Sequence, residues 1–240
     1  MRRAWLLAGV LLFPALAGAS GDAAGQAQFT LDALRRVAPI GPFEPEVGQW
    51  VVYRIGEGAQ TSFLTVALLG REKTSAGEAN WLELGYGYRP EGGMVALKMR
   101  VVGDPRHPRK VDRLLLRLGG GRAMELNPGE LAQVQRSSKT DEAGVAPDPG
   151  ALQGEPEYKQ VHGGSFNTHR VSMALGTVWI ADKAPMFHIV AGSLRGVGFE
   201  LYSSGTGAKD WVGEAKVHLG FQADGGMIVT DGGAALGGTP

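Results

Sequence analysis

The 240-residue sequence contains no cysteine. This absence excludes disulfides, thiolate nucleophiles and zinc–thiolate sites together, and it also excludes a lipid anchor on an N-terminal cysteine. The formal net charge is zero, from 24 basic and 24 acidic residues, which argues against a protein that binds nucleic acid through a general positive field. The fold must therefore be held by its hydrophobic core alone.

Beyond the N-terminus the chain has no long apolar run. Arg2 and Arg3 precede an apolar stretch from Ala4 to Leu16, and Ala17-Gly-Ala19 then supplies the small-x-small pattern of a signal-peptidase site. The stretch is shorter than the roughly 20 apolar residues of a membrane-spanning helix. We expect a signal peptide over residues 1–19, cleavage after Ala19, no later transmembrane span, and a periplasmic or secreted protein without a lipobox.

Short strands separated by turns make up the remaining sequence. Residues 20–28 are expected to form a flexible N-terminus, residues from about 137 to 156 a mobile insertion, and residues 223–240 a Gly/Ala-rich disordered tail. Helical spacing and N-terminal capping residues predict short helices at 29–37 and from Asn127 to about Gln135. Strands are predicted at Trp50–Ile55, Phe63–Leu69, Trp81–Tyr86, Val95–Val102, Val111–Leu118, Phe166–Met173, Thr177–Ala181, Phe187–Val190, Phe199–Tyr202 and Val212–Phe221.

The order of these elements indicates the fold class. Strands do not alternate with long helices, so a doubly wound α/β sheet is excluded. The predicted fold is mainly β (α+β), a single antiparallel, strongly curved sheet or incomplete barrel with two or three short helices. This β-rich, half-barrel-like domain spans residues 29–222.

Alternation along the strands assigns their side chains to two faces. In Val95–Val102, for example, Leu97 and Met99 point one way while Lys98 and Arg100 point the other. One face is therefore apolar, as either an ordinary core or a hydrophobic ligand-binding concavity requires. The residues expected on that concave side are Leu64, Val66, Leu68, Leu82, Leu84, Leu97, Met99, Leu114 and Leu116.

Cations are concentrated on the opposite face and at its connecting turn. Asp104 and Asp112 offset them only in part. Such a patch fits an anionic partner, but it also fits a solvated sheet face whose charges discourage aggregation, and the second interpretation is the simpler one. The basic patch consists of Lys98, Arg100, Arg106, Arg109, Lys110, Arg113 and Arg117.

The sequence carries no catalytic, metal or cofactor motif. It lacks the Gly-x-Ser-x-Gly elbow of the α/β-hydrolases, and its five histidines show neither His-x-His nor His-x-x-x-His spacing. Gly205-Thr-Gly-Ala-Lys209 lacks the spacing of a phosphate-binding loop. We therefore predict a non-enzymatic protein with no cofactor and no metal.

Three stretches carry a resemblance to a known group. They are Gly48-Gln-Trp-Val-Val-Tyr53, Val178-Trp-Ile180 followed by Pro185-Met-Phe187, and Gly198-Phe-Glu-Leu followed by Gly205. In this order they resemble uncharacterised exported bacterial proteins of the lipoprotein-carrier (LolA/LolB-like) half-barrel group, over residues 29–221. The resemblance implies an incomplete antiparallel barrel whose helices close a hydrophobic concavity. The acidic, Pro-rich insertion and the lack of a recognisable acyl-chain motif depart from the true carriers.

These observations favour a soluble periplasmic binding or carrier protein. Its concavity is expected to hold a lipid, a lipoprotein acyl chain or a hydrophobic segment of another protein, at about 0.8 kcal/mol per buried CH₂. The alternative is an envelope structural or adaptor protein that binds a partner protein, a polyanion or an anionic surface through the basic patch. A secreted hydrolase is a third and weaker hypothesis. No nucleic-acid partner is expected.

Overall fold

The computed structural model describes residues 45–56, 58, 61–90, 95–103, 111–129, 131–132, 154–173, 176–194, 196–214, 217–221 and 227–231. The predicted signal peptide and flexible N-terminus lie outside these residues, as does the predicted helix at 29–37. The described strands are β1 (Trp50–Ile55), β2 (Ser62–Thr74), β3 (Gly77–Gly87), β4 (Val95–Val102), β5 (Val111–Leu118), β6 (Met124–Leu126), β7 (Glu155–Val161), β8 (Gly164–Met173), β9 (Gly176–Ile180), β10 (Ile189–Leu194), β11 (Val197–Gly205), β12 (Val217–Phe221) and β13 (Met227–Asp231).

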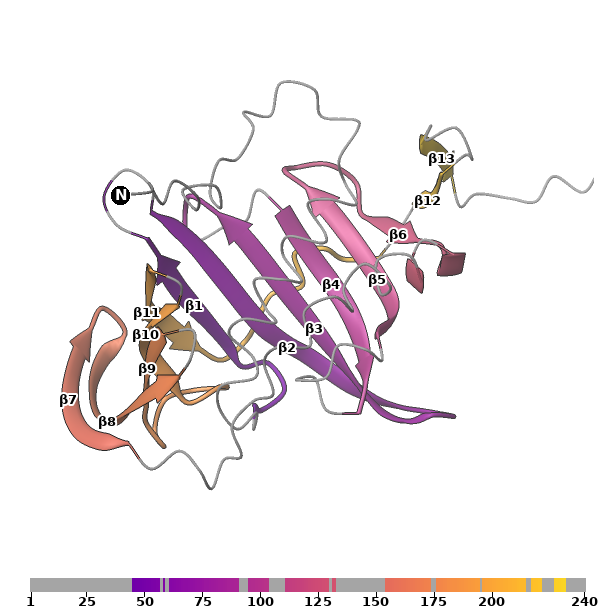
Figure 1. The fold of residues 1–240 in the computed structure, drawn as a ribbon. Coiled ribbons are helices and arrows are strands. Elements are labelled where there is room, and N and C mark those ends of the chain that lie inside the picture. The colour runs from indigo at the N-terminus through magenta and orange to yellow at the C-terminus, as the bar shows by residue number, and fades with distance from the viewer. Residues whose placement is uncertain are drawn as a thin grey trace, which may run out of the picture.

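These strands form one sheet in the order β13-β12-β6-β5-β4-β3-β2-β1-β11-β10-β9-β8-β7 (Figure 1). From β6 to β7 all neighbours are antiparallel, whereas β12 pairs with β6 in parallel. The first strand, β1, lies between β2 and β11 and so joins the β1–β6 meander to the β7–β11 meander. The prediction of a single antiparallel sheet that remains open is confirmed for the eleven strands from β6 to β7, because β7 and β6 have no pairing with each other.

The prediction of two or three short helices is wrong for the part of the chain that the structure describes. At the predicted helix start, the Leu131 N–H donates to the Asn127 carbonyl at 3.0 Å, which closes a single helical turn. Residues 133–135 lie outside the described residues. A helix this short gains few hydrogen bonds for the residues it orders, so the capping residues at its start are weak evidence for a helix of several turns.

Several strand boundaries in the structure also differ from the predicted ones. Strand β10 begins at Ile189 rather than at Phe187, and the chain reaches β12 only at Val217 rather than at Val212. Strand β7 starts at Glu155, inside the end of the predicted insertion, and β13 lies inside the predicted tail. Residues 137–153 of the insertion, and residues 223–226 and 232–240 of the tail, lie outside the described residues.

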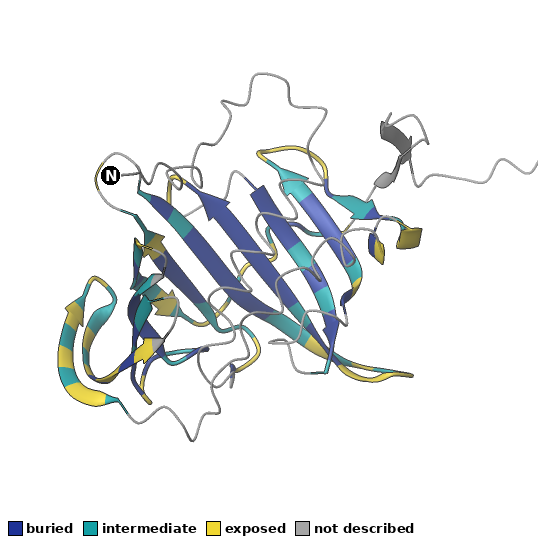
Figure 2. Ribbon diagram, in the orientation of Figure 1, coloured by how far each residue is buried: buried dark blue, intermediate teal, exposed yellow. Residues whose placement is uncertain are grey.

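The main core lies against one face of the sheet. Buried residues run across β1 to β5, while the tip of the long β2–β3 hairpin and much of β7 are exposed (Figure 2). A second, smaller cluster on the opposite face consists of Ala96, Leu115, Ala123 and Val212, with Trp81 packed against it. The sheet thus has one broad apolar face and one mainly polar face with a small buried patch.

Candidate functional site

All nine residues predicted for the concave side lie on the same face and are at most 1% exposed. The strand register places them in rows that run across the sheet, because opposite residues on neighbouring strands share a face. One row passes from Val66 through Leu84 and Leu97 to Leu116. The next passes from Leu68 through Leu82 and Met99 to Leu114.

A third row extends this apolar face toward β11. Leu64 lies opposite Tyr53 of β1 and Tyr86 of β3, and Tyr53 in turn lies opposite Leu201 of β11. All of these residues belong to one buried cluster. The apolar face is therefore continuous from β11 to β5, and sequence reasoning found its central part.

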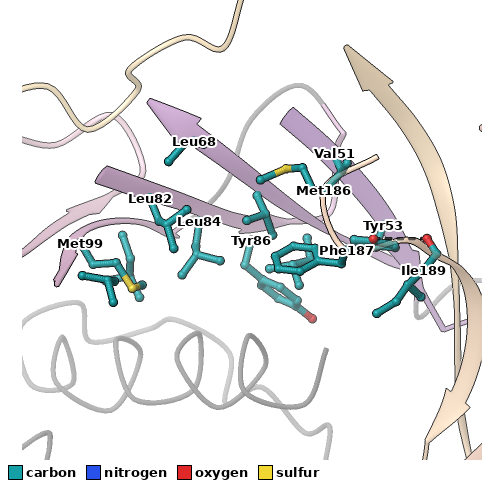
Figure 3. Close-up of a cluster of buried hydrophobic side chains, with 14 of the residues drawn as sticks. Val51, Tyr53, Leu68, Leu82, Leu84, Tyr86, Met99, Met186, Phe187 and Ile189 are labelled. Atoms are coloured by element: carbon teal, nitrogen blue, oxygen red, sulfur yellow. Dashed lines mark hydrogen bonds between the residues drawn. The ribbon is translucent and has the colours of Figure 1, made fainter. Parts of the chain in front are cut away.

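The turn Ala181–His188, between β9 and β10, packs two side chains onto this apolar face. Met186 is 2% exposed and Phe187 is 1% exposed, and both belong to the same cluster as the nine predicted residues. Figure 3 shows Phe187 near Tyr53 and Tyr86. Sequence reasoning placed Phe187 at the start of a strand and missed this role.

The backbone of the Ala181–His188 turn is strained. Met186 has φ of 60° and His188 has φ of 58°, in the left-handed region that costs an L-residue roughly 1–2 kcal/mol. The Phe187 N–H donates to the Pro185 carbonyl at 2.8 Å, which makes Met186 the centre of a γ-turn of the rare, positive-φ kind. Burying Met186 and Phe187 gains about 1.5–3 kcal/mol for each side chain, which offsets this strain.

Two tyrosine hydroxyls interrupt the apolar face at its β1–β3 end. The fully buried Tyr53 hydroxyl donates to the Ile189 carbonyl at 3.4 Å, directly after the turn (Figure 3). The Tyr86 hydroxyl donates to the Ser62 hydroxyl at 2.8 Å. Burial raises the pKa of both tyrosines, so both stay protonated and neutral at physiological pH.

The opposite face carries four residues of the predicted basic patch, Lys98, Arg100, Arg113 and Arg117, as alternation indicated. Arg100 forms a two-pronged pair with Asp112, at 2.8 Å for both bonds, and also binds Glu72 at 2.6 Å. The hydrogen bonds to Asp112 and then Glu72 raise the pKa of Arg100. Arg106, Arg109 and Lys110 lie outside the described residues.

The other three cations are also partnered. Arg113 binds both carboxylate oxygens of Glu125, at 2.7 and 3.0 Å. Lys98 binds Asp210 at 2.5 Å, and Arg117 donates to the carbonyls of Gly121 and Trp211. Lys98, Arg100 and Arg113 are therefore each paired with a carboxylate, and Arg117 is held by backbone carbonyls.

The β11–β12 connection, residues Thr206–Glu214, docks onto this polar face and is called the connecting segment below. The Asp210 carboxylate accepts the Gly213 N–H at 2.7 Å, which folds the segment into a tight turn. Val212 is buried in the smaller cluster, and the Trp211 ring lies against Gly85, where an added Cβ would approach it to 3.1 Å. Part of the predicted basic patch is thus the docking surface for the chain's own segment.

Glu83 is the buried centre of this docking surface. Its side chain is 2% exposed and accepts the N–H groups of Trp211 at 3.1 Å and Val212 at 2.9 Å. Burial raises the pKa of Glu83 to about 7, although the two N–H bonds lower it, and neighbouring Asp210 raises it further. Sequence reasoning missed Glu83, although a lone charge between Leu82 and Leu84 in the predicted strand Trp81–Tyr86 was a usable signal.

The comparisons with known proteins leave the family open. Neither a protein-family model nor a curated protein sequence matches the chain. Among solved structures, a candidate exported protein with a YmcC-like fold from Bacteroides fragilis is similar at 11% identity, with a TM-score of 0.34, over 70% of this chain and all of that one. A candidate lipoprotein from Parabacteroides distasonis is similar at 12% identity, with a TM-score of 0.31, over 69% of this chain and 99% of that one. Similarity at this level carries no argument about function, and the LolA/LolB-like resemblance stays a prediction.

The described residues contain no group of three or more His, Cys, Asp or Glu side chains that could hold a metal ion. They also include no helix long and apolar enough to cross a membrane.

Proposed function

We propose that this chain is an exported binding or carrier protein that holds a lipid, a lipoprotein acyl chain or a hydrophobic segment of another protein against its apolar face. The observation that supports the proposal best is the continuity of that face. Its rows of apolar side chains cross five neighbouring strands, β1 to β5, without a charged residue. At about 4.8 Å between strands, this width is roughly 19 Å.

The energetics favour a long chain as the ligand. Each buried methylene contributes about 0.8 kcal/mol, whereas association costs on the order of 4–15 kcal/mol. A short chain therefore cannot compensate for the cost of binding, and a chain of many methylenes can. Affinity should rise steeply with acyl length in an otherwise identical series.

Native mass spectrometry of the purified protein, combined with organic extraction, tests the proposal. We expect a co-purified lipid mass that disappears on extraction. Titration of the extracted protein with a series of fatty acids should then give a Kd that falls as the chain lengthens from eight to sixteen carbons. Absence of both a lipid mass and fatty-acid binding would contradict the proposal.

The adaptor hypothesis receives less support from the geometry. Lys98, Arg100 and Arg113 are already paired with carboxylates, and Arg117 binds backbone carbonyls. The adaptor hypothesis would gain support if the protein bound anionic phospholipid vesicles and lost this binding when Arg100, Arg113 and Arg117 were all replaced by Ser. The variant must remain folded for this comparison. Unchanged vesicle binding in that variant would remove these residues as the contact surface.

A further inference from the structure

Strand β7 stands at one end of the strand order and has β8 as its single partner among the described strands. Its pairing with β8 is regular, from Glu155 opposite Arg170 to Val161 opposite Gly164. Figure 1 shows β7 at the rim of the fold, beside β8. An edge strand carries a row of backbone N–H and C=O groups that a further strand can bind. We therefore examine what the outer side of β7 presents.

The register with β8 determines which residues of β7 present these outer backbone groups. A two-residue turn joins the strands, so Val161 and Gly164, which close it, exchange hydrogen bonds with each other. Hydrogen-bonded pairs alternate along an antiparallel ladder. The outward backbone groups are therefore those of Pro156, Tyr158 and Gln160. Pro156 has no N–H to offer, which fits the outer side of an edge strand.

The side chains of β7 place two opposite charges at fixed positions. Glu157 and Lys159 are ion-paired at 3.2 Å, and both contact Trp179 of β9. The Trp179 Nε1–H donates to the Glu157 carboxylate at 2.8 Å, and the Lys159 ammonium lies 3.9 Å from the centre of the ring. The hydrogen bond from Trp179 and the pairing with Lys159 lower the pKa of Glu157, which keeps it charged. On the other side of the strand, the Tyr158 side chain is 64% exposed.

This arrangement is complementary to itself. When two copies of β7 run antiparallel about Tyr158, the Glu157 of each copy lies opposite the Lys159 of the other, and the two Tyr158 residues face each other. The Tyr158 backbone groups then bond to their counterparts, and each Gln160 N–H meets the Pro156 carbonyl of the other copy. Centring the pair on Glu157 or on Lys159 instead would place like charges directly opposite, which is destabilising.

We infer that the protein forms a two-fold symmetric homodimer in which the β7 strands of two copies pair antiparallel about Tyr158. A two-fold interface uses the same surface on both copies and must complement itself, as this strand does. A single strand pair buries little area, so the dimer should dissociate on dilution. The inference does not depend on the proposed function, because β7 lies outside the strands β1 to β5 that carry the proposed ligand face.

Charge reversal tests the pairing. Sedimentation velocity of the purified protein from roughly 5 to 500 µM should show a monomer–dimer equilibrium. Lys159→Glu and Glu157→Lys each place like charges opposite and should each weaken the dimer by about tenfold or more. An equimolar mixture of the two variants should dimerise again, because every charge then faces an unlike one. Arg54→Glu, on the internal strand β1, makes the same charge change as Lys159→Glu and should leave dimerisation unchanged.

A second pair of variants tests the backbone contacts without altering charge. Gln160→Pro removes an N–H that points away from β8, so the β7–β8 hairpin should stay intact while the dimer weakens by about tenfold. Gln160→Ala keeps the N–H and should dimerise like the unmodified chain. Circular dichroism establishes that each variant is folded.

The absence of cysteine allows the register to be tested by cross-linking. Opposite residues of a hydrogen-bonded pair have Cα atoms about 5.5 Å apart, which a disulfide can span. Tyr158→Cys should therefore form an intermolecular disulfide under mild oxidation. Asn167→Cys is the control, since Asn167 lies opposite Tyr158 on β8 and is also exposed. It should cross-link about tenfold more slowly, because it lies one strand further from the dimer axis.

Several outcomes would overturn the inference. One is a protein that stays monomeric throughout the concentration range. Another is a dimer that persists in Lys159→Glu and in Gln160→Pro, since it would use a different surface. Failure of the mixed charge variants to associate, while the unmodified chain dimerises, would exclude the register about Tyr158. Protection of the Tyr158 amide from hydrogen exchange in the dilute monomer would show that another segment of the same chain covers β7.

Discussion

Glu83 of β3 and Val212 of the connecting segment, 129 residues apart in the sequence, are joined by a 2.9 Å hydrogen bond from the Val212 N–H to the Glu83 carboxylate. The neighbouring Trp211 N–H binds the same carboxylate. Because the two N–H groups are backbone groups, no substitution in the connecting segment except proline can remove them. Glu83, whose charge changes with pH, is thus one of the side chains that hold the connecting segment, together with Lys98 and Arg117.

The first prediction concerns the pH dependence of stability. The pKa of Glu83 is raised from 4.5 to about 7 in the folded protein, so the folded state holds a proton that the unfolded state has already released. Stability should therefore be greatest below about pH 4.5 as far as this group is concerned, and should fall as the pH rises toward 7, by on the order of 1–3 kcal/mol. Urea unfolding between pH 5 and pH 8 measures the effect.

The neighbouring Asp210 does not obscure this effect. Burial raises the pKa of Asp210, but the hydrogen bonds from Lys98 and Gly213 outweigh it and leave the pKa lowered, so the contribution of Asp210 to stability is complete above about pH 4 and is lost only at lower pH. Glu83→Gln keeps an acceptor but cannot ionise, so its stability should change less with pH than that of the unmodified chain. Identical slopes in the two proteins would show that Glu83 does not titrate in this range.

A second prediction concerns the pair Lys98–Asp210. Lys98 is largely buried and also donates to the Gly213 carbonyl at 3.2 Å, so its pairing with Asp210 should be stronger than that of an exposed pair. A double-mutant cycle with Lys98→Met and Asp210→Asn should give a coupling free energy of about 1 kcal/mol. The same cycle on the more exposed Arg54–Glu200 pair should give less than about 0.5 kcal/mol. Equal values would contradict the expectation that burial strengthens the Lys98–Asp210 pair.

The third prediction concerns Gly85, whose missing side chain makes room for Trp211. In Gly85→Ala the added methyl group would lie 3.1 Å from the ring, so the Trp211 side chain must shift. We expect a loss of about 1 kcal/mol and faster amide hydrogen exchange confined to residues 206–214. Gly70→Ala in β2 is the control, since nothing lies within 4 Å of its added methyl group. Equal exchange in both variants would contradict this account.

A fourth prediction concerns the N-terminus. Expression of the full sequence in a Gram-negative bacterium should place the protein in the periplasmic fraction with Ser20 as its first residue, because Ala17-Gly-Ala19 fits a signal-peptidase site. Intact mass and N-terminal sequencing measure this. Ala19→Tyr should retain the uncleaved form. Recovery of the uncleaved chain in the cytoplasm, with the natural residues in place, would overturn the predicted export.

Sequence reasoning found the local features of the sheet. The alternation of Leu97 and Met99 with Lys98 and Arg100 is a property of consecutive residues, and both the strand and its two faces follow from it. The nine residues of the apolar side were identified in this way, and all lie on one face. Whether they hold a ligand is a separate matter, because a core and a binding face share the same pattern.

The missed features depend on residues that are distant in the sequence. Asp210 neutralises Lys98 across 112 positions, so the basic patch looked more charged in the sequence than it is in the fold. Phe187 is of a residue type that is common in strands, but a γ-turn that no local pattern indicates places its side chain in the core. The connecting segment looked like the start of β12 because Val212 is apolar, yet Val212 is buried on the polar face by docking rather than by strand pairing.

The position of β1 has a consequence for how the chain acquires its structure. Trp50 pairs with Gly205, so one side of β1 has no partner until almost the whole domain is available. Pairings between such distant segments carry a large loop-closure entropy and give high contact order, which slows folding to the millisecond-to-second range or beyond. A chain of this kind remains incompletely folded during synthesis, as the export predicted from its N-terminal sequence would require.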